Sequence, residues 1–261
     1  DEIRHTIAGE TSTKVYFVTT GLKEEIQVIR KVRPPRLLCS YWFFKTKPLR
    51  NFVGSLGYSP EIMLDSGAYT AFTKGRSVCL FDYIRYIEEN AEYISRYVSL
   101  DVIGDSFSTK AYFEIMRHKG LHPIPVFHYG DEPYLMAYYE ARGDGEIALG
   151  NSVGIRDKKA VAEWCESVHR QYPAVKLHLL GSSSKKILDC GAVDSCDSSA
   201  WYTMAVNGKP KTVPGRTSAA KIARAEENMI RIMEVFNEIS VPAVDHCGEC
   251  ADSEIQPVCS F

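Results

Sequence analysis

Residues 147–180 read IALGNSVGIRDKKAVAEWCESVHRQYPAVKLHLL, and this stretch decides the fold class. It begins with the β-rich run Ile147–Asn151 and ends with a second such run, Val175–Leu180. The apolar residues between the two runs follow the three- and four-residue spacing of one helix face: Val161, Trp164, Cys165 and Val168. Since this middle segment is long enough for a crossover helix, the two strands are predicted to be parallel.

The same alternation of strand and helix extends over most of the chain. Eight short β-rich runs are predicted as strands: Val15–Thr19, Leu37–Phe44, Ile62–Asp65, Tyr97–Val102, Ile124–His128, Ile147–Asn151, Val175–Leu180 and Ala192–Asp197. Eight units in about the 250 residues that a (β/α)8 barrel needs predict an α/β TIM barrel. An open Rossmann-type sheet is the weaker alternative, because no Gly-x-Gly-x-x-Gly turn follows the first run.

The chain is expected to divide into a barrel domain and a small appendage. The last predicted helix covers Ser218–Glu238, with Thr217 or Ser218 as its N-terminal cap, and completes a catalytic domain of residues 1–240. Residues 241–261 contain three cysteines and almost no apolar periodicity, so they are expected to form a short Cys-rich segment.

Composition narrows the class of protein. Hydrophobic residues make up 45% of the chain and charged residues 25%, which is typical of a folded globular protein. A net charge of −2 argues against a protein that coats nucleic acid non-specifically. No apolar run reaches the roughly 20 residues of a membrane span, so a cytoplasmic protein is expected, or one of the host cytoplasm if a phage encodes it. Five scattered cysteines are predicted to be free thiols: Cys39, Cys79, Cys165, Cys190 and Cys196.

Polar residues end most of the predicted strands, where a TIM barrel carries its active site. They are Asp65, Ser66 and Gly67, Asp101 and Asp105, His128 and Tyr129, Gly150 and Asn151, Gly181 and Ser182, and Asp194 and Asp197. Individually such residues also cap helices, but their convergence on one rim favours a functional site. A pair of carboxylates there could cleave a glycosidic bond, which fits a glycoside hydrolase and a base-exchanging enzyme equally well.

Longer strings at these positions resemble one family. Leu64-Asp65-Ser66-Gly67-Ala68-Tyr69 is similar to the Asp-Ser-Gly-Gly-Tyr/Phe motif of tRNA-guanine transglycosylases. Further strings follow in the family's order: Ser99–Asp101, Phe127–Gly130, Ala148–Gly154, Leu179–Gly181 and Gly191–Asp197. The resemblance covers about residues 60–205, and it implies a transferase that exchanges guanine in a polynucleotide for another base.

The resemblance implies a role for each matching residue. Asp197 would be the nucleophile that forms a covalent glycosyl-enzyme, and Asp65 would be the general acid/base. Asp101 would accept hydrogen bonds from the guanine edge, because an ionised carboxylate accepts from two adjacent N–H donors. Tyr69 and Leu180 would sandwich the base, and Gly150 would present its backbone to it. The whole base-binding set is predicted to be Asp101, Tyr69, Ser66, His128, Tyr129, Gly150, Asn151, Leu180 and Gly181.

Departures from the family pattern bear on the substrate. His128-Tyr129-Gly130 replaces a Gln-Gly pair, so the contact that selects among 7-deazaguanines is not inherited. Ser198-Ser199-Ala200-Trp201 replaces a Pro-Thr-Arg stretch near the polynucleotide. These features are most similar to phage and bacterial relatives that insert 7-deazaguanines into DNA. DNA is therefore the favoured partner, with tRNA as the alternative and a free base such as preQ0 as the second substrate.

Two other functions are alternatives to a transglycosylase. A non-catalytic partner subunit is disfavoured because both Asp65 and Asp197 are present. A carbohydrate glycosidase is disfavoured by the lack of a glutamate pair. Relatives of this family often form homodimers, which is an expectation from the resemblance alone.

Two basic segments are candidates for nucleic-acid contact. Ile26–Pro60 contains seven Lys or Arg residues and no acid, interleaved with aromatic residues. Such a pattern suits a phosphate backbone with unstacked bases, although charge runs are often only solvated faces. The predicted contacts are Arg33, Arg36, Lys45, Lys47, Arg50, Lys209 and Lys211. A flipped-out guanine would be needed for a duplex substrate.

A structural zinc site is predicted near the C-terminus. His246, Cys247, Cys250 and Cys259 lie within 14 residues, and Cys-Gly-Glu-Cys has a spacing that suits tetrahedral zinc. The resemblance also implies zinc near this end, but with a different ligand order. A redox pair, a disulfide or unpaired thiols are the alternatives, and no organic cofactor is expected.

Overall fold

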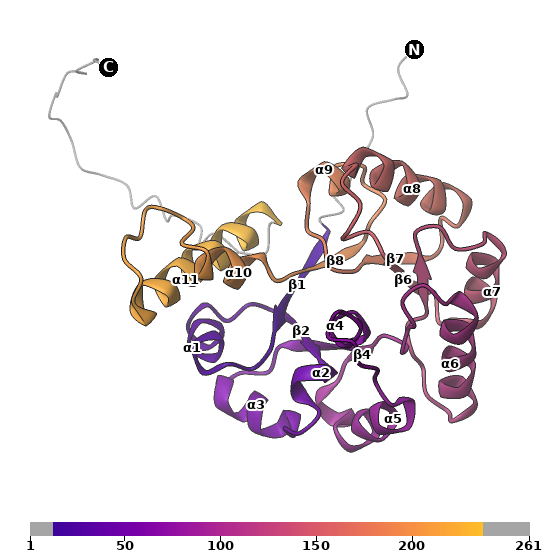
Figure 1. Ribbon diagram of the computed structural model, residues 1–261, viewed down its shortest axis with the longest axis horizontal. Helices are drawn as coiled ribbons and strands as arrows, with labels where there is room; N and C mark the ends of the chain where they lie inside the picture. Colours follow the sequence, from indigo (N-terminus) through magenta and orange to yellow (C-terminus); the bar gives the residue numbers. More distant parts are fainter. Residues whose placement is uncertain (1–12, 237–261) are drawn as a thin grey trace, which may run out of the picture.

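Eight parallel strands form the centre of the molecule. The structure is a computed structural model that describes residues 13–236. The strands hydrogen bond in the order β4-β3-β2-β1-β8-β7-β6-β5. The two ends of this sheet meet through a parallel bridge between Val98 and Ile124, where the Ser99 N–H donates to the Ile124 carbonyl at 2.8 Å. The sheet therefore closes on itself, and the predicted TIM barrel is confirmed (Figure 1).

A strand is present at each of the eight predicted places. Their bounds are β1 Lys14–Thr19, β2 Arg36–Ser40, β3 Glu61–Asp65, β4 Arg96–Tyr97, β5 Val126–His128, β6 Glu146–Gly150, β7 Lys176–Leu179 and β8 Ser195–Ser198. However, β4 ends at Tyr97 and not at Val102, because beyond the single bridge at Val98 the chain pairs with no neighbouring strand. The prediction was wrong at the end of the second strand, because Tyr41–Phe44 forms the short helix α2. Ser40 pairs with Asp65, the last residue of β3, so beyond this point β2 has no neighbouring strand to continue the ladder.

Helices surround the barrel. They are α1 Lys23–Val32, α3 Leu49–Leu56, α4 Ala68–Thr73, α5 Leu80–Glu89, α6 Ser106–His118, α7 Tyr134–Arg142, α8 Lys158–Gln171, α9 Lys185–Leu188, α10 Ala200–Val206 and α11 Ser218–Val235, with the 3-10 turn η1 at Ala91–Tyr93. In Figure 1, α4 lies over the central strands, inside the ring of the other helices. This short helix therefore stands at one end of the barrel.

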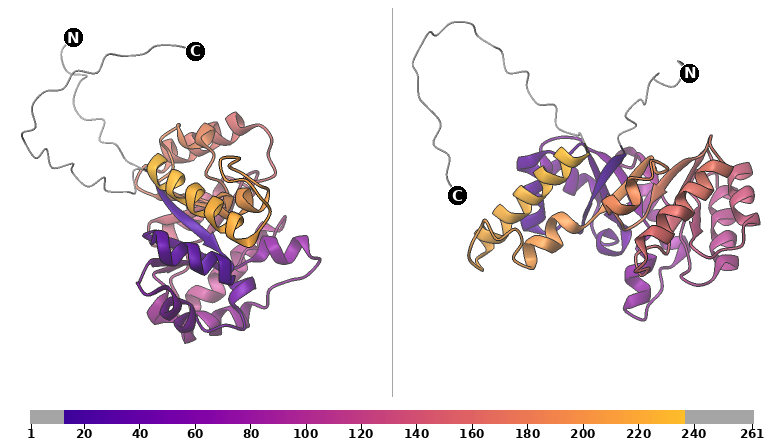
Figure 2. Two further views of the ribbon diagram at one scale, coloured as in Figure 1. Left: turned by 90° about the vertical axis from the view of Figure 1, so that its left-hand side faces the viewer. Right: turned by 90° about the horizontal axis from the view of Figure 1, so that it is seen from above.

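The last helix matches its prediction closely. The Thr217 hydroxyl accepts the Ala220 N–H, as expected of the N-terminal cap, and α11 then extends to Val235. Figures 1 and 2 show α10 and α11 packed together on the side of the barrel next to α1. Ion pairs join α1 to α11 near both ends of α1, Glu24 with Lys221 and Lys31 with Glu226.

Apolar side chains fill both the barrel interior and the layer under the helices. Val15 and Phe17 of β1 face the helices, whereas Tyr16 between them faces the barrel axis, as alternation along a strand requires. The interior cluster consists of Tyr16, Leu38, Met63, Val98, Ile124, Val126 and Ala148. At the amino-terminal ends of the strands, Arg96 pairs with Glu61 at 3.1 Å and with Glu146 at 2.8 Å. The barrel interior is thus packed, and the opposite rim is the end at which enzymes of this fold carry their active sites.

Three further predictions can be compared with the fold. The five scattered cysteines are free thiols, and Cys39, Cys165 and Cys196 are buried. Within residues 13–236, none of the helices combines the length and apolar character required to cross a bilayer. The predicted appendage, residues 241–261, lies outside the described residues.

Candidate active site

Three carboxylates meet at the carboxyl ends of the strands. Asp65 ends β3, Asp101 follows β4 and Asp197 belongs to β8, and all three line one cavity of about 230 Å³. Tyr69 and Leu180, the predicted base sandwich, line the same cavity. The other predicted site residues on its wall are Gly150, Asn151 and Gly181. The structure therefore brings together residues from five strands and their loops, as the barrel topology predicts.

Asp65 has the environment of a general acid/base. Burial raises the pKa of its carboxyl, and the neighbouring charges of Asp101 and Asp197 raise it further, to about 7. The Gly67 N–H, which donates to Asp65 Oδ2 at 2.9 Å, and the Ser40 hydroxyl act in the opposite direction. A carboxyl with a pKa near neutrality can both give and take a proton at physiological pH.

The backbone around Asp65 explains why glycine occupies position 67. Gly67 has φ +74, and a Cβ there would lie 2.5 Å from Cβ of Trp42 and 2.9 Å from its backbone nitrogen. Only glycine satisfies both the left-handed conformation and this close approach. The tight turn that results places the Gly67 N–H on Asp65 and leads directly into α4, which carries Tyr69.

Asp197 is buried and held through one of its two oxygens. Oδ1 accepts the Gly181 N–H at 2.7 Å, and Nε2 of His178 lies 3.4 Å from the same atom. His178 is itself fully buried, with Nδ1 2.8 Å from the Ser195 hydroxyl and its ring edge-on to Tyr16. Within residues 13–236, Oδ2 of Asp197 accepts no hydrogen bond. An oriented carboxylate with one uncommitted oxygen suits a nucleophile.

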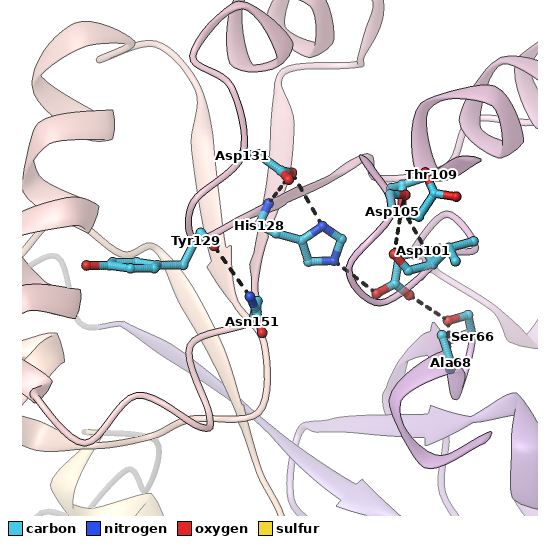
Figure 3. Close-up of polar contacts among 10 residues, drawn as sticks. Ser66, Ala68, Asp101, Asp105, Thr109, His128, Tyr129, Asp131 and Asn151 are labelled. Carbon is cyan, nitrogen blue, oxygen red and sulfur yellow. Dashed lines mark hydrogen bonds and ion pairs between the residues drawn. The ribbon is translucent and has the colours of Figure 1, made fainter. Parts of the chain in front are cut away.

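Asp101 is part of a chain of polar contacts that Figure 3 shows running from Asp131 through His128 and Asp101 to Ser66. Nε2 of His128 is 3.2 Å from Asp101 Oδ2, and the Ser66 hydroxyl donates to Asp101 Oδ1 at 3.2 Å. On the other side, Nδ1 of His128 lies 3.4 Å from Asp131 Oδ2, which also accepts the His128 backbone N–H at 2.9 Å.

The charge on His128 follows from these neighbours. Burial by itself lowers the pKa of the imidazole, but hydrogen bonds and charge from Asp101 and Asp131 outweigh it and raise the pKa to about 9. His128 is therefore an imidazolium at neutral pH. Asp131 was not among the predicted site residues, although its position three residues after His128 in a strand-end loop could have suggested it.

The structure places several predicted base contacts differently. Ser66 and His128 are buried behind Asp101 and do not line the cavity. The Tyr129 ring also lies away from the cavity, packed edge-on against Trp164 with ring centroids 5.2 Å apart. Gly150 was predicted to leave room for the base. A Cβ at this position would lie 2.8 Å from Cδ2 of His128, so a side chain there would collide with His128 whether or not a base is bound.

Several cavity residues were not predicted from the sequence. Asn151 was predicted, and it has a φ of 61. Its side-chain amide donates a long hydrogen bond of 3.4 Å to the Tyr129 carbonyl. The additional lining residues are Val18, Leu38, Ser40, Phe43, Thr70, Ile103, Val153, Gly154 and Ser199. Most are apolar or small residues spread over strands, helices and loops, a type that carries no motif, and only the closure of the barrel identifies them.

The first basic segment is divided between the two ends of the barrel. Lys45 follows β2 and is exposed beside α4, where its Nζ lies 4.0 Å above the Trp42 ring. Lys47 and Arg50 are exposed too, but they line a hollow with Glu92 and Tyr93, which come shortly before β4. Arg36 begins β2, and Arg33 lies before it, at the amino-terminal end of the strand, where it stacks on Tyr58. Contact of these residues with a polynucleotide stays a prediction.

The second basic segment surrounds a separate hollow. Lys209 and Lys211 lie in the loop between α10 and α11, and Lys211 helps to line a space of about 820 Å³. Arg216 and Lys221 also line it, and no Asp or Glu is among its lining residues. This hollow is larger than the carboxylate cavity, but none of its lining residues is a carboxylate that could serve as the acid/base or the nucleophile implied by the family resemblance.

The predicted zinc ligands His246, Cys247, Cys250 and Cys259 lie outside the described residues. In the part of the chain from residue 13 to residue 236, no group of three or more His, Cys, Asp or Glu is arranged to hold a metal ion. The zinc site stays a prediction.

The fold and the rim of carboxylates define the chain as a TIM-barrel protein whose cavity at the carboxyl ends of the strands is lined by three carboxylates among apolar side chains. No family model matches the sequence, and no curated protein is found as a relative.

Comparison with solved structures shows the same fold. A putative fructose-1,6-biphosphate aldolase from Coccidioides immitis is 14% identical over 87% of this chain and 90% of that chain, with a TM-score of 0.58. A mutant tryptophan synthase alpha-subunit from Pyrococcus furiosus is 12% identical over 85% of this chain and 98% of that chain, with a TM-score of 0.55. At this identity the likeness concerns the fold alone.

Proposed function

We propose that the protein is a transglycosylase that exchanges guanine in a polynucleotide, preferably DNA, for a free 7-deazaguanine base. The observation that carries the proposal is the set of three carboxylates around one cavity, each in a different environment. Asp65 is poised near neutrality, Asp197 is oriented with one uncommitted oxygen, and Asp101 is held by a cationic histidine. Enzymes of known structure share this fold, which is consistent with a catalytic role.

The first half of the reaction opens the glycosidic bond. The Asp197 carboxylate attacks C1′ of the nucleotide, so that an oxygen–carbon bond forms as the bond from C1′ to the base nitrogen breaks. The electron pair of the broken bond stays on guanine, and protonated Asp65 supplies the proton that neutralises it. The product is a covalent glycosyl ester on Asp197 and an ionised Asp65.

The second half reverses these steps with another base. Ionised Asp65 removes the proton from the ring nitrogen of the incoming base, and this nitrogen attacks C1′. The bond to Asp197 breaks and its electron pair returns to the carboxylate, which restores the starting charges. Two displacements at C1′ retain its configuration. No step requires a metal ion or an organic cofactor.

The size of the cavity supports recognition of a single flat base. Pockets for drug-sized ligands occupy about 300–1,000 Å³, and this cavity of about 230 Å³ is smaller. A nucleotide in a duplex would thus have to swing its base out of the stack to reach Asp197. Lys45 is exposed beside this rim, over the Trp42 ring, and could neutralise a flanking phosphate.

Transfer of radiolabelled guanine tests the proposal. Wild-type protein is incubated in parallel with duplex DNA, single-stranded DNA and bulk tRNA, and Asp197→Ala serves as the blank. We expect label in DNA and none in the blank. Label in tRNA alone would assign the same chemistry to tRNA, and absence of label from every polynucleotide would refute the proposed exchange.

A further inference from the structure

His128 occupies a position between two carboxylates that the proposed reaction does not use directly. Its two ring nitrogens lie 3.2 Å from Asp101 Oδ2 and 3.4 Å from Asp131 Oδ2, and its side chain is 7% exposed. Figure 3 shows the imidazole spanning the gap between the two acids. His128 does not line the cavity, and its polar contact with a lining residue is the one with Asp101, so its effect on a bound base is expected to pass through that carboxylate.

The contacts of Asp101 leave a specific acceptor pattern. A carboxylate has about four lone-pair sites, two on each oxygen. His128 takes one site on Oδ2 and the Ser66 hydroxyl takes one on Oδ1, so each oxygen keeps a site for a group in the cavity. Two acceptors side by side match two adjacent N–H donors, which is the pattern on the edge of guanine and 7-deazaguanine but not of adenine.

We infer that His128 is a positioning residue that clamps Asp101 as a fixed, two-oxygen acceptor for bases with two adjacent N–H donors. This inference rests on the proposed function, since it assigns the specificity of the same cavity. The inference also explains why His128-Tyr129-Gly130 stands where the family that this chain resembles has a Gln-Gly pair. In this chain, His128 contacts Asp101 and not the base.

The charges around the cavity show why a cation is needed there. Asp101, Asp131, Asp65 and Asp197 are four acids close together, and the pKa of Asp65 is raised in part by Asp101 and Asp197. The pKa of the Tyr83 phenol, from α5, is raised by burial and by Asp65 and Asp101, so this group is neutral. Lys and Arg are absent from the lining of the cavity, which makes His128 the cation that contacts Asp101 within residues 13–236.

Removal of the positive charge should therefore weaken the hold on Asp101 and the affinity of the cavity for a base with two N–H donors. In His128→Gln the amide still donates a hydrogen bond, so the variant separates charge from hydrogen bonding. A hydrogen bond with an ionised partner is about twice as strong as one between neutral groups. We expect the dissociation constant for guanine to be about tenfold larger in His128→Gln than in the wild type when both are measured at the same pH. Comparison at equal pH removes the titration of Asp65, which both proteins share.

The test combines guanine calorimetry at pH 6 and pH 8 with an NMR titration of the His128 ring nitrogens. His122→Gln is the matched control, because His122 also pairs with an acid, Asp144 at 3.1 Å, but is exposed at the other end of the barrel. Its guanine binding should equal that of the wild type. Thermal unfolding of both variants establishes that they are folded at the two pH values.

The outcomes separate this inference from the proposed function. A dissociation constant for guanine in His128→Gln that equals the wild-type value at both pH 6 and pH 8 would overturn the clamp, while the exchange reaction stands. An imidazole that loses its proton below pH 7 in the NMR titration would also overturn it, without reference to activity. If the wild type neither binds guanine nor transfers it, the proposed function fails, and the NMR result then reports only the ion pair.

Discussion

The backbone N–H of Gly181 lies 2.7 Å from Oδ1 of Asp197. This single contact joins the loop after β7 to the residue proposed as nucleophile on β8. Gly181 has φ +70, and a Cβ there would lie 2.6 Å from Cγ2 of Val153. Because the N–H is aimed by a conformation that favours glycine, the orientation of Asp197 depends on the identity of residue 181.

Gly181→Ala should impair exchange without unfolding the barrel. The new methyl group forces the loop to shift, and a displacement of about 1 Å at a reacting group can cost about 100-fold in rate. We expect kcat for guanine exchange to fall by about that factor. Gly54→Ala is the control, since a Cβ on Gly54 meets no atom within 4 Å. Equal rates in the two variants would show that the Gly181 contact does not orient Asp197.

Asp65 should make stability depend on pH in a defined direction. Its pKa is raised from 3.8 to about 7 in the folded protein, because burial and the neighbouring acids disfavour the charged form. A raised pKa contributes stability that is complete below about pH 4 and is lost as the pH rises through 7. Relative to Asp65→Asn, the wild type should lose free energy of unfolding between pH 5 and pH 7 and then stay level.

Urea denaturation of the two proteins at pH 5, 6, 7 and 8 measures this difference. A difference between wild type and Asp65→Asn that is constant across the series would show that Asp65 titrates normally. Asp65→Asn should also exchange guanine about 10²–10⁴-fold more slowly than the wild type, because it lacks the general acid/base. Full activity of Asp65→Asn would remove the role proposed for this residue.

Tyr69 should contribute to base affinity through stacking. Tyr69 is 57% exposed. It and Thr70 are the two residues of α4 that line the cavity. Stacking on an aromatic ring is worth roughly 1–3 kcal/mol per base. Tyr69→Ala should therefore weaken guanine binding in calorimetry by about that amount, whereas Tyr69→Phe should retain it.

Phe72 provides the matched control for this prediction. It is on the same helix and is 58% exposed, but it does not line the carboxylate cavity. Phe72→Ala should bind guanine like the wild type. If Phe72→Ala and Tyr69→Ala weaken binding equally, the loss reflects α4 as a whole and not stacking on Tyr69.

Basic charge beside the cavity should determine how polynucleotide binding depends on salt. On a single strand each phosphate contact contributes about 0.7 to the slope of log affinity against log salt concentration. Lys45→Gln should therefore reduce this slope by about 0.7 in a fluorescence anisotropy titration with single-stranded DNA. Guanine binding should be unaffected, because Lys45 does not line the cavity.

Arg33→Gln tests the division of the basic segment. Arg33 is exposed but precedes β2, at the end of the barrel remote from the carboxylates. The slope of log affinity against log salt concentration for Arg33→Gln should equal that of the wild type. A loss of slope in Arg33→Gln as large as that in Lys45→Gln would mean that the polynucleotide reaches the opposite end of the barrel.

Much of the architecture could be predicted from local patterns. Apolar runs of strand length alternate with helical spacing, and parallel strands of this kind bury both faces, so each unit is visible in its own residues. The end of β2 was misassigned because Tyr41–Phe44 is as apolar and aromatic as a strand. Its helical form depends on contacts with distant residues, including Tyr83, Tyr86 and Phe52.

The sequence by itself determined the barrel and the identity of its rim acids, because a strand end and its polar residue are neighbours in the chain. Only the tertiary structure decided which side chains face the cavity and which stand behind them. His128 and Tyr129 are adjacent in sequence, yet one contacts Asp101 and the other packs on Trp164. Successive side chains at a strand end point in opposite directions, and their neighbours come from other strands that meet only when the barrel closes.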